Sequence, residues 1–317
     1  MKRALKWSLF AIGGVLTLLL ILFALFLHGF GLANFGRMAF GIGQGYDSVK
    51  PDLPAMPAGT AVLIFSKTNG FRDDEQIAAA KAALGDIARE RGWSSFDTEN
   101  AAVFNPDQLR RFKVVVWNSV SGDVLTPAQR EAFRTWLEAG GGYVGLHGAG
   151  GDPDYAWRWY VDDLVGAQFI GHTMNPQFQQ ATLRIEDHDN PATRHLGATW
   201  KRTDEWYSFA SNPRARGYRI LATIDERTYV PRMDLPWPFT DRNIGMGGDH
   251  PMVWTHCVGN GRAFYSALGH TASSYGEVAH RRLIGGAISW AAGLEGSGCA
   301  NGVEIPSSAV HRKEAGR

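Results

Sequence analysis

The sequence predicts an α/β protein, a three-layer sandwich in which helices cover both faces of a mostly parallel sheet. Short apolar runs alternate with segments of helical periodicity after residue 60. Near-continuous apolar strands separated by helices are typical of parallel sheets that are buried on both faces. A long apolar run at the N-terminus adds a transmembrane helix to the prediction.

Each predicted element has a local signal. The strands are short apolar runs, and they become denser toward the C-terminal half. The first helix of the domain has acidic residues in its first turn, and Thr126 and Pro127 give the next helix a cap and a proline in its first turn. The predicted strands are 61–65, 93–97, 114–117, 143–146, 181–185, 218–223, 252–254 and 262–267, and the predicted helices are 74–91, 126–139 and 275–292.

The N-terminal segment has the pattern of a membrane anchor. Lys2, Arg3 and Lys6 precede an uncharged apolar run over 7–27, and crossing a bilayer takes roughly 20 apolar residues. Positive residues before the run predict a single-pass protein of the cell membrane whose domain faces the periplasm or the cell exterior. A cleaved signal peptide is the alternative, although its apolar region is usually about 7 to 15 residues long.

Four segments are expected along the chain: an anchor over 1–28, a linker over 29–59, one domain over 60–296 and a polar tail over 297–317. The domain is long enough to bury a full core as a single unit. The formal net charge of +1 gives no sign of nucleic-acid binding.

The two cysteines, Cys257 and Cys299, have no metal-binding spacing. They could form one disulfide in an oxidising compartment or remain as two free thiols.

Residues 141–151, GGYVGLHGAGG, are the most informative stretch. An apolar strand ends at His147, and a glycine-rich turn follows at once, as when one side chain is presented at a sharp turn before a helix. The alternative is a plain strand exit with a histidine that caps the next helix. In open parallel sheets, ligands bind where the strands end, which here groups the segments 66–72, 118–123 and 147–152.

These motifs resemble those of the ThuA-like (trehalose utilisation) family. The resemblance implies the flavodoxin-like or class I glutamine amidotransferase-like fold, and it covers nearly the whole domain. The family often has histidine after its Phe-Arg pair, where this chain has Asp73. The matching segments are Thr68-Asn69-Gly70-Phe71-Arg72, Gly145-Leu146-His147-Gly148-Ala149, Gly166-Ala167-Gln168-Phe169 leading to His172, Asp204-Glu205-Trp206-Tyr207, Pro251 to His256 and Gly259 to Thr271.

The resemblance also argues against one activity. Amidotransferases of this fold place a catalytic cysteine at the elbow, where this chain has His147. The late histidine of those enzymes matches His270, but Ala272 stands where they have glutamate. Without a thiol there is no nucleophile for glutamine hydrolysis, so we expect that the protein is not a glutamine amidotransferase.

The candidate site combines histidines at strand ends with one acid and one cation. Such a set suits acid–base work near neutral pH. A divalent metal with three protein ligands is the alternative, although no HxH or HExxH spacing supports it and no cofactor is otherwise expected. Trp206 is either an aromatic face for a sugar ring or part of the core. The candidate catalytic residues are His147, Glu205 and His270, and the candidate substrate-binding residues are Arg72, His172, Trp206 and His256.

The family resemblance implies a small-molecule carbohydrate substrate. It suggests an enzyme that cleaves a glycoside or a 3-keto-glycoside, with a histidine as base, Glu205 as acid and Arg72 stabilising enolate charge. The alternative function is a non-catalytic carbohydrate-binding or assembly domain that kept the fold and lost activity.

Overall fold

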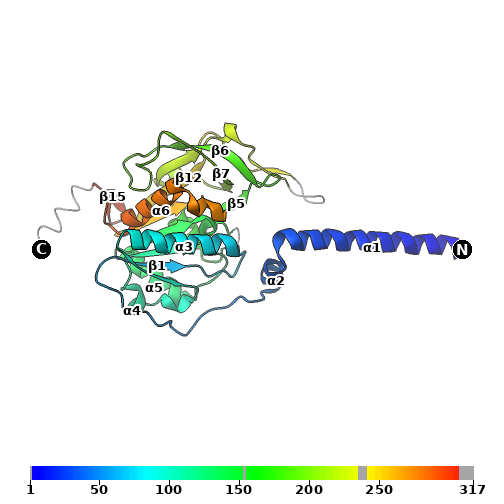
Figure 1. Cartoon of the computed structure of the whole chain (residues 1–317), viewed down its shortest axis with the longest axis horizontal. Coiled ribbons are helices and arrows are strands. Elements are labelled where there is room, and N and C mark those ends of the chain that lie inside the picture. Colours follow the sequence, from blue (N-terminus) through cyan, green and yellow to red (C-terminus); the bar gives the residue numbers. More distant parts are fainter. Residues whose placement is uncertain (1, 153–154, 235–240, 307–317) are drawn as a thin grey trace, which may run out of the picture.

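The computed structural model describes residues 2–152, 155–234 and 241–306. It centres on a nine-stranded sheet with the order β2-β1-β3-β4-β13-β12-β9-β6-β7 (Figure 1). The strands are β1 (Ala61–Phe65), β2 (Ser94–Thr98), β3 (Val114–Asn118), β4 (Gly142–Leu146), β6 (Phe178–Ile185), β7 (Thr199–Glu205), β9 (Arg219–Ile224), β12 (Pro251–Val258) and β13 (Gly261–Ser266).

The sheet has a parallel half and an antiparallel half. The neighbours from β2 to β13 are all parallel, which is the part that the apolar runs predicted. From β13 onward each neighbour is antiparallel. These pairings make β4, β13 and β7 run in the same direction, so their carboxyl ends point toward the same edge of the sheet.

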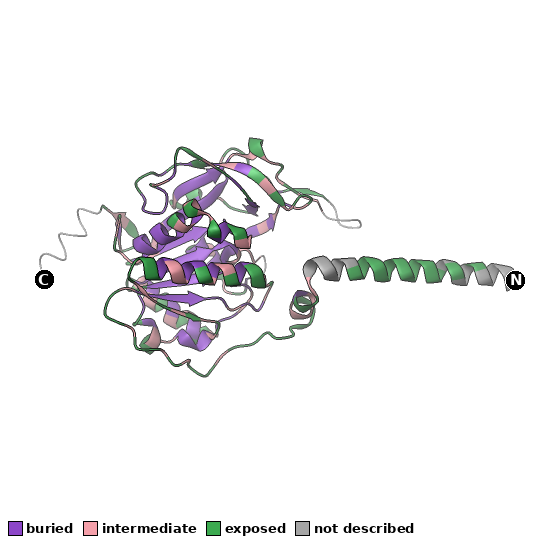
Figure 2. Ribbon diagram, viewed as in Figure 1, coloured by how far each residue is buried: buried purple, intermediate pink, exposed green. Residues whose placement is uncertain are grey.

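Helices enclose the parallel half. α3 (Asp74–Glu90) and α6 (Val278–Ala291) lie together over one face, and α5 (Pro127–Glu138) lies on the opposite side (Figure 1). Thr126 caps α5 in a capping box with Gln129, which satisfies backbone N–H groups at the start of the helix. The strands between these layers are buried along their whole length, β1, β3 and β4 included (Figure 2).

The prediction of a membrane anchor is wrong. The N-terminal run forms a helix, α1 (Lys2–Phe30). Spanning the hydrocarbon core takes one helix with about 20 apolar residues, and within the described residues no helix meets the requirement for both length and apolar character. The transmembrane helix, the membrane as a partner and the placement of the domain at the cell membrane facing the periplasm or exterior are therefore not supported.

Residues just after α1 contact the domain, although the sequence suggested a linker there. In α2 (Leu32–Phe40), the Asn34 amide donates to the Arg72 carbonyl oxygen at 2.8 Å and accepts from the Arg72 backbone N–H at 2.9 Å. Gln44 donates to the Asn69 carbonyl oxygen at 2.6 Å. This N-terminal strap, defined as residues 34–47, therefore lies against the loop that follows β1.

The C-terminal segment begins with a hairpin, β14 (Gly298–Ala300) and β15 (Val303–Ile305); residues 307–317 of the predicted tail lie outside the described residues. A disulfide joins Cys257 in β12 to Cys299 in β14, with Cα atoms 5.6 Å apart. Of the two states that the sequence left open, the structure shows the bridged one.

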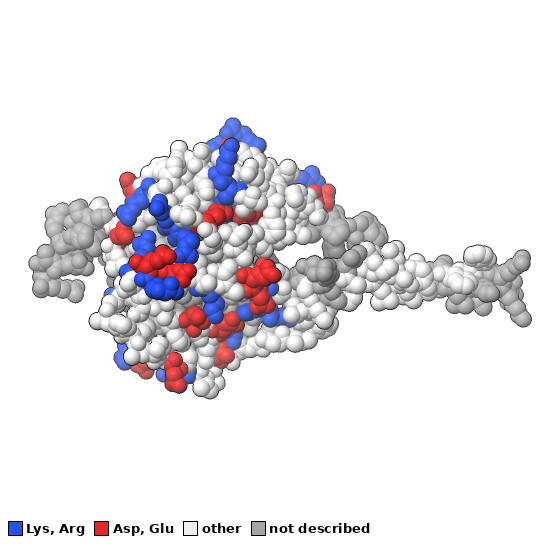
Figure 3. Space-filling view, in the orientation of Figure 1, with Lys and Arg blue, Asp and Glu red and all other residues white. Residues whose placement is uncertain are grey.

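Charges on the face seen in Figure 3 are interspersed, with acidic and basic groups lying beside one another. Many charged side chains of the described residues form ion pairs, such as Arg214 with Asp249 and Arg281 with Glu90. This pattern fits the near-zero net charge of the chain.

Candidate functional site

The site is built around the elbow after β4. The strand is buried throughout, and the chain then turns at His147 with a φ of 45°, a left-handed conformation that is uncommon for a residue with a side chain. Gly150 allows the turn, because a Cβ there would lie 2.5 Å from the Tyr265 ring. The His147 side chain is only 4% exposed. Backbone strain of this kind is concentrated at functional sites.

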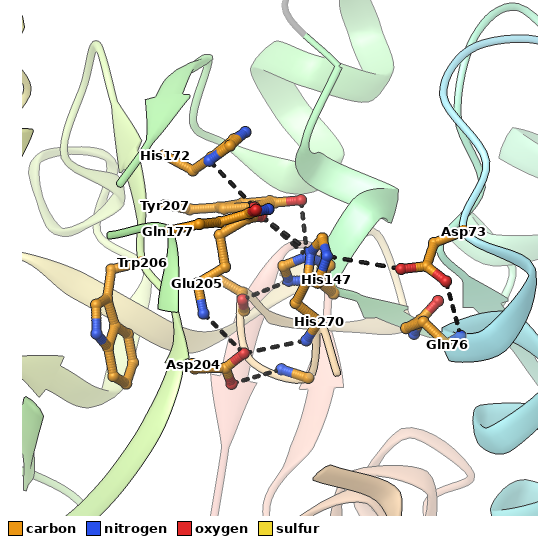
Figure 4. A network of polar contacts seen from close by, with 12 residues as sticks. Asp73, Gln76, His147, His172, Gln177, Asp204, Glu205, Trp206, Tyr207 and His270 are labelled. Carbon is orange, nitrogen blue, oxygen red and sulfur yellow. Dashed lines mark hydrogen bonds and ion pairs between the residues drawn. The ribbon is translucent and has the colours of Figure 1, made fainter. Parts of the chain in front are cut away.

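Three side chains from distant parts of the chain meet at this elbow (Figure 4). His147 Nε2 lies 2.9 Å from His270 Nδ1 and 3.4 Å from Glu205 Oε2. His270 Nδ1 lies 3.1 Å from the same carboxylate oxygen. Since His147 follows β4, His270 follows β13 and Glu205 ends β7, the three come from strand ends that share one edge of the sheet.

Glu205 is held on its other oxygen as well. Gln177 donates to Oε1 at 2.6 Å, and His172 Nδ1 lies 3.1 Å from the same atom. His172 ends β5 (Phe169–His172), which pairs with β8 (Tyr207–Phe209) in a small separate sheet. The Glu205 side chain is 2% exposed and that of His172 is 28% exposed, so the cluster opens on the His172 side.

The charges of the cluster are set by mutual contacts. Burial alone would raise the pKa of Glu205, but its polar contacts with His147 and His270 hold it well below its usual range. Burial opposes a charge on His270, yet the hydrogen bond and the charge of Glu205 outweigh it and raise the pKa of this histidine. Glu205 is therefore an anion, and His270 is the group of the pair that holds a proton.

Four contributing residues were not among the sequence candidates. Tyr207 places its hydroxyl 3.0 Å from His147 Nε2, and burial, followed by the charge of Glu205, raises its pKa well above 10, so it stays protonated. Asp204 accepts the backbone N–H of His270 at 3.1 Å. Gln177, which donates to Glu205, is the third. The fourth is Asp73, the departure from the family pattern, which lies 3.6 Å from His270 Nε2 and also caps α3.

Three sequence candidates lie elsewhere. Arg72 is paired with Glu99 and Asp74, and its described contacts do not include the cluster. Trp206 is fully buried and donates its indole N–H to the Gln179 carbonyl oxygen, pointing away from Glu205 (Figure 4).

His256 stacks on Tyr218 with ring centroids 3.8 Å apart. Within β12, His256 pairs with Ala263 near the start of β13, so it lies at the edge of the sheet opposite the elbow. Burial lowers the pKa of His256 to about 4. The structure therefore brings together His147, His172, Glu205 and His270, and it leaves out Arg72, Trp206 and His256.

The cluster could also hold a metal. The inward ligand atoms of His147, Glu205 and His270 all lie within 4.8 Å of one another, and no other such group of three is found among the described residues. Two imidazoles and one carboxylate can exchange protons with a bound molecule or act as ligands of a cation.

The fold and the site define an α/β protein with a histidine-centred polar cluster at the carboxyl edge of its sheet. The model of the ThuA family, described as trehalose utilisation, matches residues 61–291, and the chain belongs to this family. Membership implies a part in carbohydrate utilisation in general terms.

Solved structures agree with this fold. A ThuA-like protein from Bacteroides uniformis is 22% identical with a TM-score of 0.60, covering 77% of this chain and 95% of its own. A ThuA-like protein from Parabacteroides merdae is 18% identical with a TM-score of 0.55, covering 74% and 90%. A comparison with curated proteins finds no match.

Proposed function

We propose that the protein is an enzyme of carbohydrate utilisation that cleaves a glycoside or a 3-keto-glycoside at the cluster of His147, Glu205 and His270. The observation that carries the proposal is the convergence of these three buried groups, from three separate strand ends, on one point. A core histidine needs only one or two hydrogen-bond partners. Here the polar atoms of three titratable groups contact one another, and the cluster is open to solvent on the His172 side. Perturbed pKa values of this kind are common at catalytic sites.

The residues suit an elimination on a 3-keto sugar. A carbonyl at C3 acidifies the C2–H bond. Loss of that proton to a base, formation of a C1–C2 double bond and departure of the C1 oxygen would break the glycosidic bond, with a proton delivered to the leaving alcohol. His147 has its hydrogen on Nδ1, because that atom donates to the Ala267 carbonyl oxygen at 2.9 Å. Its Nε2 then carries a lone pair that can accept a proton.

His270, whose pKa is raised, is the better proton donor, and Glu205 is better suited to orient both rings as an anion than to act as the acid. Tyr207 can donate a hydrogen bond to negative charge that develops beside His147. Arg72 is not proposed in that role, since its guanidinium is engaged by Glu99 and Asp74.

The test is an activity screen of the full chain on oxidised and unoxidised disaccharides. His147→Ala should lower turnover by roughly 10²- to 10⁴-fold, the usual range for loss of a general acid or base. His256→Ala is the matched control, because this histidine lies at the opposite edge of the sheet. Turnover that is equal in both variants would contradict the assignment.

The alternative, a non-catalytic carbohydrate-binding or assembly domain, predicts a different result in the same screen. It requires sugar binding by the wild-type chain without cleavage of any substrate. In that case His147→Ala should weaken sugar affinity, and there would be no turnover to lose.

A further inference from the structure

We infer that the inward atoms of His147, Glu205 and His270 form a binding site for one divalent transition-metal cation such as Zn²⁺. The inference rests on the proposed function only in taking this cluster as the place where the sugar reacts. It goes further because it names a cofactor, and with the cation bound His147 and His270 would act as its ligands in place of the proton-transfer roles described above.

The spacing of the three atoms is the first argument. Nε2 of His147, Nδ1 of His270 and Oε2 of Glu205 are separated by 2.9, 3.1 and 3.4 Å. A metal bound at about 2.1 Å holds neighbouring ligand atoms about 3.0 Å apart in octahedral geometry and about 3.4 Å apart in tetrahedral geometry. The triangle therefore has the size of one face of a coordination sphere.

The positions of the hydrogens are the second argument. The Ala267 carbonyl oxygen can only accept, so the hydrogen of neutral His147 is on Nδ1 and a lone pair on Nε2 points into the cluster. His270 turns Nε2 toward Asp73, which leaves Nδ1 pointing inward. Two ring nitrogens that face each other at 2.9 Å repel unless a proton or a cation lies between them.

The outer contacts of the ligands are the third argument. Each of the three has its remaining polar atom held: His147 by Ala267, His270 by Asp73, and Glu205 by Gln177. Metal-binding histidines almost always donate their other N–H to a carbonyl or a carboxylate, which fixes the ring and its tautomer. His147 follows that rule, and at His270 the Asp73 carboxylate lies 3.6 Å from the outer ring nitrogen.

Charge and ligand type decide which cation would bind. Glu205 is a buried anion, and buried anions require a compensating positive charge. Imidazole nitrogen favours Zn²⁺, Fe²⁺ or Co²⁺ over Mg²⁺ or Ca²⁺, and two histidines with one carboxylate leave positions open for water or substrate. His172 Nδ1 lies 3.1 Å from the other oxygen of Glu205, and the Tyr207 hydroxyl lies 3.0 Å from His147 Nε2. When bound, the cation would polarise a sugar carbonyl, a role that Arg72 is not placed to fill.

The test measures metal binding directly. The untagged full chain is stripped with a chelator and titrated with Zn²⁺ by calorimetry and with Co²⁺ by visible absorption, which reports nitrogen and oxygen ligands. We expect one ion per chain. His147→Ala, Glu205→Gln and His270→Ala should each weaken binding by at least about 100-fold, since even outer-shell substitutions typically cost 10- to 100-fold. Asp73→Asn should weaken metal binding by about 10- to 100-fold. His256→Ala should bind the metal as tightly as the wild type does.

Circular dichroism shows that each variant is folded, and the near-isosteric Glu205→Gln keeps the test valid if an alanine variant unfolds. The inference is overturned if the folded wild-type chain binds none of these ions, or if binding survives all three ligand substitutions. Full cleavage of keto-glycosides by the metal-free chain would overturn the cofactor role of the cation while leaving the proposed function intact. Binding at these residues without cleavage of any glycoside would support the metal site and overturn the proposed function.

Discussion

His280 is a fully buried histidine that remains neutral in the folded protein. Nδ1 donates to the Ser274 carbonyl oxygen at 3.0 Å, and Nε2 has no hydrogen-bond partner among the described residues. Burial, followed by the positive charge of Arg202, lowers the pKa of His280 to about 3. The folded protein therefore excludes a proton that the unfolded chain would bind.

This histidine should make the protein less stable in acid. Its pKa is about 3 in the folded protein and about 6.5 in the unfolded chain. As the pH falls below 6.5, the unfolded chain takes up the proton and the folded chain does not. The protein keeps the full stability due to neutral His280 above pH 6.5 and loses it progressively toward pH 3. At pH 5 the loss amounts to about 2 kcal/mol. In His280→Asn, the difference in unfolding free energy between pH 7 and pH 5, measured with denaturant, should be smaller by about this amount; equal differences would contradict the prediction.

Single residues show where sequence reasoning succeeds and fails at the site. The glycine pattern around the elbow marks His147, and the family resemblance adds Glu205 and His270. Side-chain direction explains two other outcomes. Trp206, the residue just after β7, turns its side chain away from that of Glu205, much as neighbouring residues of an extended chain point to opposite sides. Along the loop after β1, Asp73 contacts His270 while its neighbour Arg72 turns to Glu99.

Helix α6 packs directly on the loop at Pro191, and a glycine permits this approach. A Cβ on Gly286 would lie 2.0 Å from the Pro191 carbonyl oxygen, so the helix rests directly on the backbone of that loop. Gly85 of α3 also lies inside a helix, but a Cβ there would meet nothing within 4 Å. A substitution at Gly85 therefore tests helix propensity alone, and the same substitution at Gly286 also tests packing.

These two positions should respond oppositely to alanine. Gly85→Ala should raise the free energy of unfolding by about 0.5 to 1 kcal/mol, because alanine is the better helix former. Gly286→Ala should lower it by about 1 to 3 kcal/mol, because overpacking forces α6 away from the loop. Denaturant unfolding of both variants gives the comparison, and a stabilised Gly286→Ala would show that the loop yields easily.

At the level of elements, strands with apolar residues were predictable and strands with polar ones were not. The prediction of 61–65 matches β1, whose residues are all buried. The edge strand β7 was missed because its inward residues include Arg202 and Asp204, a buried ion pair in place of an apolar alternation. The short strands β5 and β8 depend on each other across 35 or more residues of chain, which no local pattern reveals.

For the molecule as a whole, the disulfide fastens the C-terminal hairpin to the sheet. Cys257 and Cys299 are separated by 42 residues, and they tie β14 to β12. Closing a loop of this length restricts the unfolded chain, an effect of about 2 to 4 kcal/mol in typical proteins.

Thiol chemistry tests the bridge. Unfolded, unreduced protein should contain no thiol that reacts with a labelling reagent, and both cysteines should react after reduction. Cys299→Ser should lower the free energy of unfolding by about 2 to 4 kcal/mol under oxidising conditions. In the presence of reductant, this variant and the wild type should have similar stability. Labelling of both residues before reduction would contradict the bridge.

The global architecture was the most predictable level and also held the clearest error. Alternating apolar runs and helical segments indicate the α/β sandwich, because that pattern depends on burial alone. The same reliance on an apolar run produced the anchor prediction, which the described helices do not support.

The N-terminal strap lies outside the family match but holds the loop that leads to the cluster. A chain shortened to the family match at residue 61 would strip Asn69 of its bonds to Gln44 and Gly45, and the Arg72 backbone of its bonds to Asn34. These partners brace the loop that leads directly into Asp73, next to His270. Deletion series should therefore stop before residue 31, since shorter chains would loosen the loop beside His270 while leaving the core intact.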